Sequence, residues 1–156
     1  DGMSTTLSVF TPLLDAAHGV SPHAPAAAVA ELTRRLDPRG PAAQALNREL
    51  VRLLEAGEIA QRGAPPVKYG RVAKATEATR DFSIDVVDMT GPGPRHRHPR
   101  GELNYCIALE GAPTFMGQAP GWVVEPPGSE HVPTVAGGRM LIVYLLPQGE
   151  IEFLAS

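Results

Sequence analysis

The residues best suited to chemistry lie in two short motifs, HxHxxxE and PxGxxH, which supply His96, His98, Glu102 and His131. In an extended strand, side chains two residues apart point to the same face, so His96 and His98 can bind one metal ion. Glu102 has the same parity, and His131 is expected on a neighbouring strand. Three ring nitrogens and one carboxylate oxygen suit a divalent first-row metal such as Fe, Mn, Ni or Zn, with positions left for water or substrate. We predict one catalytic metal site per chain.

The alternative is that these are loop histidines in a polar segment rich in arginine and proline. With this composition, HxHxxxE is expected by chance in roughly one chain of a hundred, and the second motif lowers that frequency. Three of the chain's five histidines lie in the two motifs. The pattern therefore favours metal binding.

The two motifs resemble the pair of metal-binding motifs of the cupin superfamily, whose fold is a small antiparallel β-barrel, or jelly roll. A closer resemblance, to the small bacterial cupins that include 4-hydroxylaminobenzoate lyase, rests on four segments: Pro65–Arg71, Gly101–Tyr105, Gly121–Gly128 and Tyr144–Phe153. This resemblance implies an ammonia-releasing lyase that converts 4-hydroxylaminobenzoate to 3,4-dihydroxybenzoate (protocatechuate) in nitroaromatic degradation. It also implies that the metal acts as a Lewis acid on the hydroxylamino group.

Five further residues are candidates for substrate binding. If strand parity continues beyond the first motif, Asn104 and Cys106 line the barrel interior. Arg95, which has two arginines close by in the sequence, and Arg71 could each hold a substrate carboxylate through a two-point ion pair. Tyr144 offers a hydroxyl for proton relay. The alternatives are solvent-exposed arginines, a buried structural thiol and aromatic core packing.

Composition narrows the class of protein. The 156 residues are 43% hydrophobic, and 16 Gly with 16 Pro favour short strands and frequent turns. A net charge of −3 argues against a nucleic-acid partner and favours a small metabolite as the ligand, and the family resemblance implies that it is a small aromatic substrate. The longest apolar run, Met140–Leu146, is too short to cross a bilayer. The chain has one cysteine, and no leader sequence precedes Met3, where we expect the natural protein to start. Both features predict a cytoplasmic protein.

The chain is expected to divide into an N-terminal helical region, 3–66, and a cupin β-barrel, 67–156, that carries the metal site. Helical periodicity and N-terminal prolines predict helices at 11–20, 22–36 and 41–56. Short β-like runs predict strands at 67–73, 82–89, 103–109, 122–124, 131–135 and 140–146. Alternation also places apolar side chains outside the barrel. These need a cover, either the helices or a second subunit, and we expect a homodimer.

Two other functions remain open at this stage. A cupin dioxygenase or isomerase could use the same metal ligands on another small aromatic or keto substrate. A ligand-sensing regulator could carry a winged-helix fragment in the helical region. However, residues 1–66 contain six Arg against seven Asp or Glu, so they lack the basic face that a DNA reader needs.

Overall fold

The computed structural model describes residues 2–154, with residues 2–5 described by their backbone alone. The N-terminal third is helical, with α1 at Gly2–Val9, α2 at Thr11–Ala17, α3 at Pro25–Arg35 and α4 at Pro41–Glu55. The last three helices each have a proline at one of their first two positions, where its missing N–H costs nothing. Within the described residues, no helix is both long and apolar enough to span a membrane.

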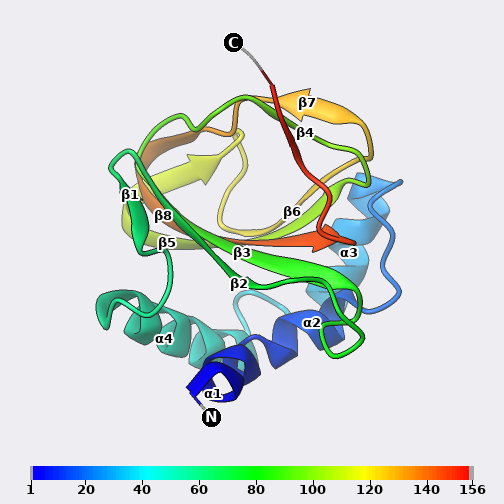
Figure 1. Cartoon of the computed structure of the whole chain (residues 1–156), viewed down its shortest axis with the longest axis horizontal. Coiled ribbons are helices and arrows are strands. Elements are labelled where there is room, and N and C mark those ends of the chain that lie inside the picture. Colours follow the sequence, from blue (N-terminus) through cyan, green and yellow to red (C-terminus); the bar gives the residue numbers. More distant parts are fainter. Residues whose placement is uncertain (1, 155–156) are drawn as a thin grey trace.

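The remainder is an antiparallel β structure. The described strands are β1 Arg62–Ala64, β2 Val67–Ala73, β3 Phe82–Met89, β4 His96–His98, β5 Glu102–Phe115, β6 Gly121–Glu125, β7 Ser129–His131, β8 Val135–Pro147 and β9 Glu152–Phe153. Six of them form a sheet in the order β1-β2-β3-β8-β5-β6, and three form a second sheet in the order β7-β4-β9. The two sheets make a cupin-like antiparallel barrel, and the N-terminal helices lie below it and to one side (Figure 1). This arrangement confirms the predicted fold class.

Several element boundaries differ from the sequence prediction. The expected strand at 131–135 is divided, because β7 ends at His131 and β8 begins at Val135. Pro133 lies between them and has no N–H for a strand ladder. β5 and β8 are longer than the predicted strands at 103–109 and 140–146. Register shifts between Ala108 and Thr114 let the two strands stay paired beyond those bounds. Helix α1 and strands β1 and β9 were not predicted.

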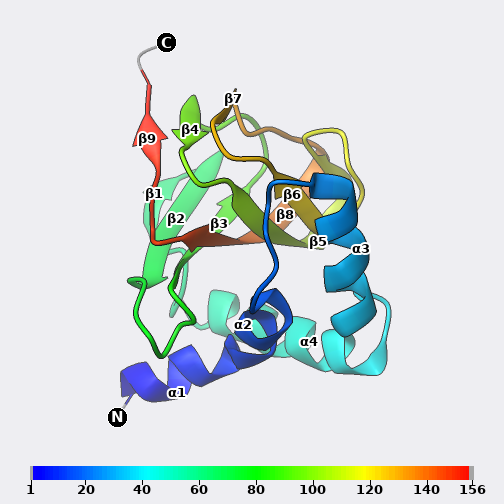
Figure 2. The same ribbon diagram turned by 90° about the vertical axis from the view of Figure 1, so that its right-hand side faces the viewer.

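Alternation along β5 and β8 divides the apolar side chains into two clusters. Leu103 and Tyr105 belong to one cluster, which also contains the apolar faces of the helices, including Leu32 and Leu50. Cys106 belongs to the second cluster, on the opposite face of the sheet. The helices therefore cover the outer face of the six-stranded sheet, and the three-stranded sheet lies on the other side (Figure 2).

Two polar contacts attach the helices to the sheet. The Tyr105 hydroxyl donates a 2.7 Å hydrogen bond to Oδ1 of Asn47 on α4. The Trp122 indole N–H donates a 3.0 Å hydrogen bond to the carbonyl of Leu36, just past α3. Each contact gives a buried aromatic side chain a partner for its one polar group, which it would otherwise bury unsatisfied.

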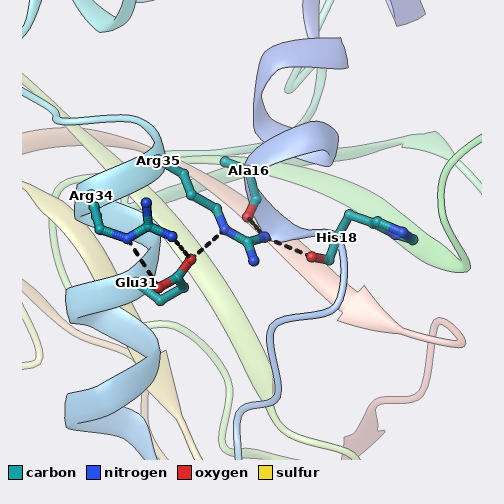
Figure 3. Close-up of polar contacts among 5 residues, drawn as sticks. All are labelled: Ala16, His18, Glu31, Arg34 and Arg35. Carbon is teal, nitrogen blue, oxygen red and sulfur yellow. Dashed lines mark hydrogen bonds and ion pairs between the residues drawn. The ribbon is translucent and has the colours of Figure 1, made fainter.

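An arginine from α3 satisfies the last carbonyls of α2. Nη1 of Arg35 donates to the carbonyl of Ala16 at 3.0 Å and to that of His18 at 2.6 Å (Figure 3). Nε of the same side chain pairs with Glu31 at 2.6 Å. Helix ends leave carbonyls without intrahelical partners, and a cation there also complements the helix dipole. Arg35 thus fixes the corner between the two helices.

Candidate metal centre

Strand β4 carries both histidines of the first motif, and its neighbour β7 carries His131. His96 and His131 are direct register partners. His96 and His98 are both buried, whereas Arg97 between them pairs with Glu152 at 2.8 Å on the exposed side. The two-residue alternation therefore turns both rings inward, as expected for a strand.

Glu102 reaches the same point by a turn and not by continued alternation. β4 belongs to the three-stranded sheet and β5 to the six-stranded sheet, so the chain must change direction between them. Gly101 makes this change with a φ of +80°, and its N–H donates to the carbonyl of His98 at 3.0 Å. A Cβ at this position would lie 2.8 Å from the carbonyl oxygen of Glu125. The motif therefore needs glycine immediately before its glutamate.

The four motif residues meet in one cluster. One potential ligand atom from each of His96, His98, Glu102 and His131 lies within 4.8 Å of the others. Nε2 of His96 is 3.0 Å from Nε2 of His131, and Nε2 of His131 is 3.4 Å from Oε1 of Glu102. Nε2 of His98 also contacts Oε2 of Glu102. Such convergence of three imidazoles and one carboxylate is what a single cation requires.

Several polar atoms of this cluster have no hydrogen-bond partner among the described residues. Both ring nitrogens of His98 and Oε2 of Glu102 are buried and unsatisfied, because the contact between them lacks hydrogen-bond alignment. Both side chains are fully buried. Unsatisfied buried polar atoms are costly, and a metal ion would bind these lone pairs. The residues present thus fit a divalent transition metal of the kind expected.

The electrostatics favour the metal-binding forms of Glu102 and His96, and favour protonation of His131 while no cation is bound. Burial alone would raise the pKa of Glu102, but contacts from His131, His98 and Asn104 outweigh it and lower the pKa to about 2. Burial and the neighbouring His98 lower the pKa of His96 to about 4. Burial lowers the pKa of His131, but Glu102 outweighs this effect and raises it. At neutral pH the cluster therefore contains a carboxylate and at least one neutral imidazole, as ligation needs.

A cavity of about 500 Å³ opens beside the cluster, with His96 and Tyr144 in its wall. Its apolar lining comes from Val67, Val87, Met89, Ile151 and Phe153. Three charged residues, Arg62, Arg71 and Asp85, also line it, together with Tyr69, Gly70, Gly93, Pro94 and Pro133. An apolar cavity with few polar groups is typical of a small-molecule site. A second hollow of about 590 Å³, beside Glu58 and Val72, includes none of the four motif residues.

Two of the five predicted substrate-binding residues line this cavity. Arg71 does so while paired with Asp85 through bonds of 2.8 and 3.0 Å. Tyr144 lies with its ring centroid 6.5 Å from that of His96, and burial raises the pKa of its phenol well above the usual value. Tyr144 is therefore a protonated hydroxyl at neutral pH, which can donate a hydrogen bond.

The other three predicted residues lie elsewhere. Asn104 contacts the cluster itself, since its Nδ2 donates to Oε1 of Glu102 at 2.9 Å. Cys106 is buried behind the cluster, and burial raises its pKa well above the usual value, so its thiol stays protonated. Arg95 pairs with Glu130 at 3.3 Å, both side chains are 44% exposed, and neither lines the cavity.

Sequence reasoning missed Arg62 and the C-terminal residues of the cavity wall. The predicted boundary between the helical region, 3–66, and the barrel, 67–156, puts Arg62 and residues 63–66 in the helical region. In the structure this segment lies in the β1–β2 hairpin, which sets Arg62 opposite Tyr69. A pair of prolines between two short extended runs is a turn signal that could have indicated the hairpin.

Comparison with known proteins agrees with this fold. The family described as PnbB: 4-hydroxylaminobenzoate lyase matches residues 17–153. The antiparallel barrel is a cupin fold, and its cluster of three histidines and one glutamate fits a cupin metal site. The chain belongs to the 4-hydroxylaminobenzoate lyase family of cupins.

Two relatives named 4-hydroxylaminobenzoate lyase match part of the chain. The protein of Nocardioides sp. (strain LMS-CY) is 33% identical over 97 residues, which are 57% of this chain and 57% of the relative. The protein of Pseudomonas putida is 34% identical over 105 residues, which are 57% of this chain and 60% of the relative. The match thus spans less than two thirds of either relative.

Solved structures with similar folds include two cupins. An RmlC-like cupin protein of Ralstonia eutropha JMP134 has a TM-score of 0.45 and 18% identity, covering 60% of this chain and 62% of that one. A cupin-like protein of Thermotoga maritima MSB8 has a TM-score of 0.42 and 19% identity, covering 64% of this chain and 87% of that one.

Proposed function

We propose that the protein is a metal-dependent lyase that converts 4-hydroxylaminobenzoate to 3,4-dihydroxybenzoate and ammonia. The observation that carries this proposal is the convergence of His96, His98, Glu102 and His131 beside an apolar cavity, in a chain of the 4-hydroxylaminobenzoate lyase family. A buried cluster of three histidines and a glutamate next to a cavity is a catalytic arrangement more than a structural one, because coordination positions remain for water or substrate.

The proposed reaction needs no external oxidant. The N–O bond breaks and its oxygen leaves as water, while a water molecule adds to the ring carbon beside the nitrogen. Hydrolysis of the resulting imine then replaces nitrogen with oxygen and releases ammonia. One water is consumed overall, because two enter and one leaves. The ring regains aromaticity as a catechol.

A divalent first-row metal held by the four motif residues would supply Lewis acidity toward the hydroxylamino group. Tyr144 can donate a hydrogen bond at the wall shared with His96, since burial raises the pKa of its phenol and keeps it protonated. The apolar lining excludes water from the faces of the aromatic ring. Arg71, fixed by Asp85, forms part of the substrate wall. Asn104 is assigned to the support of Glu102 behind the metal, and Cys106 to the apolar packing of the barrel.

The experiment is an anaerobic assay of the metal-loaded protein with 4-hydroxylaminobenzoate. We expect ammonia and 3,4-dihydroxybenzoate in equal amounts at a rate that oxygen does not change. A requirement for oxygen would instead favour a cupin dioxygenase. Absence of both products from protein with a full metal complement would reject the lyase assignment.

The oligomeric state and the cellular location are part of the same proposal. We expect a homodimer, because β1 forms an edge of the six-stranded sheet, and sheet edges favour pairing. Light scattering of the purified protein would measure the mass. A cytoplasmic location agrees with the single, unpaired Cys106. Neither point affects the chemistry above.

A further inference from the structure

The charged residues of the cavity do not balance. Arg71 and Asp85 neutralise each other through two hydrogen bonds, at 2.8 and 3.0 Å. Arg62 lines the same cavity and, within residues 6–154, has no hydrogen bond or ion pair. Arg62 is exposed and also borders the second hollow, so it places at the cavity a positive charge that has no counter-ion among the described residues. A guanidinium with free N–H donors is suited to a planar anion such as a carboxylate.

The sheet register places this charge away from the metal cluster. Arg62 on β1 is opposite Tyr69 on β2, at the edge of the six-stranded sheet. Tyr144 lies on β8, two strands further in than β2, which corresponds to roughly 10 Å at the usual strand spacing. The cavity thus has the cationic side chain at the sheet edge and the imidazole of His96 at its inner end.

This polarity matches an aromatic acid whose reacting group lies opposite its carboxylate. We propose that Arg62 is the residue that binds the substrate carboxylate and so positions the opposite end of the ring at the metal cluster. The inference rests on the proposed function for the identity of the reacting group. The carboxylate preference itself follows from the cavity alone.

Two simpler alternatives are weaker. Arg71 already binds Asp85 through Nε and Nη2, so its charge is neutralised and only its Nη1 side is left for a ligand. Arg95 is already paired with Glu130 and lies outside the cavity wall. Of the arginines considered for this role, Arg62 alone combines a place in the cavity wall with an unpaired guanidinium.

The test compares a carboxylate with its neutral isostere. Binding of 4-aminobenzoate and of 4-aminobenzamide to the metal-loaded protein is measured by calorimetry. The protein is expected to prefer the acid by about 10- to 100-fold, as for a charge-assisted hydrogen-bonded pair. Arg62→Gln should reduce binding of the acid to the level of the amide and leave the amide unchanged. Arg62→Lys should restore part of the preference.

Arg48→Gln is the matched control, because Arg48 is an exposed arginine on α4 outside the cavity. It should bind both probes as the unmodified protein does. Equal loss of acid and amide in Arg62→Gln, unchanged acid binding, or no binding of the acid by the unmodified protein would each overturn the proposal.

Turnover separates this proposal from the proposed function. In an active enzyme, Arg62→Gln should raise KM for 4-hydroxylaminobenzoate more than it lowers kcat. If the unmodified protein binds 4-aminobenzoate through Arg62 but releases no ammonia from 4-hydroxylaminobenzoate, the lyase assignment fails and the aromatic-acid site remains.

Discussion

Asn104 donates a 2.9 Å hydrogen bond from Nδ2 to Oε1 of Glu102, and both side chains are fully buried on the same face of β5. The other carboxylate oxygen, Oε2, is left beside His98 without a hydrogen bond. Asn104 therefore fixes which carboxylate oxygen is available to a cation. Partners of this kind hold metal ligands in position and increase metal affinity.

Replacing Asn104 with Leu should weaken metal binding by about 10- to 100-fold, because the Glu102 carboxylate loses its fixed orientation. The measurement is competition with a chelator of known affinity. Cys106→Ala, two residues further along the same face of β5, is the control and should change affinity little. An Asn104→Leu protein with unaltered metal affinity would show that Asn104 does not orient the carboxylate.

Replacing Gly101 with Ala should disrupt the turn that places Glu102. The new Cβ would meet the carbonyl oxygen of Glu125 and Cβ of Pro22, each at 2.8 Å, at a φ of +80°. We expect a loss of about 2–4 kcal/mol in the free energy of unfolding, measured with urea, together with reduced metal content.

Gly128→Ala separates the cost of an alanine at positive φ from the cost of the close contact. Gly128 has a similar φ of +79°, but an added Cβ would meet nothing within 4 Å. Its cost should be about 1 kcal/mol from the backbone alone, with normal metal content. Equal effects of the two substitutions would mean that the close contact at Gly101 is unimportant.

Replacing Arg35 with Met should destabilise the protein by about 1–2 kcal/mol, because the carbonyls of Ala16 and His18 at the end of α2 lose their donor. Arg34→Met is the paired control. Arg34 shares the Glu31 partner, but its side chain is 70% exposed, so its loss should cost less than about 0.5 kcal/mol. Urea unfolding measures both, and the account of this helix corner fails if the two variants are equally stable.

Stability should fall at high pH, in part through Tyr105. Burial raises the pKa of Tyr105 to about 12, against 10.0 for the free side chain, even though the hydrogen bond to Asn47 lowers it. A phenol that holds its proton more tightly when folded stabilises the protein fully below about pH 10. This contribution of about 2 kcal/mol is lost as the pH rises through 12.

The variant Tyr105→Phe should therefore lose less stability than the unmodified protein between pH 9 and pH 12. Thermal unfolding across that range is the measurement. Tyr69→Phe, which removes a phenol from a side chain that is 48% exposed, serves as the comparison. Parallel stability curves for the unmodified protein and Tyr105→Phe would show that this phenol makes no contribution.

Local sequence rules account for the parts of the site that lie within a single strand. The inward direction of His96 and His98 follows from alternation, and so does the outward direction of Tyr105 on β5. Apolar spacing similarly indicated α3 and α4, whose buried faces include Leu32 and Leu50.

The remaining parts depend on contacts between segments that are distant in sequence. Glu102 joins the histidines through a turn between two sheets, which alternation cannot follow. Strand β9 has only two residues and exists through its pairing with β4, so Phe153 carried no local signal. Arg62 likewise carried no local sequence signal, because the β1–β2 hairpin brings it to the cavity.

The most direct test of the central claim is a metal titration of the chelator-treated protein, followed by turnover of 4-hydroxylaminobenzoate without oxygen. Fe, Mn, Ni and Zn are compared as divalent ions. We expect no turnover before addition, then a rise in activity with at least one of these metals that ends at one ion per chain, and neither effect in His98→Ala. Full activity of the metal-free protein, or equal metal binding and turnover in His98→Ala, would contradict the account.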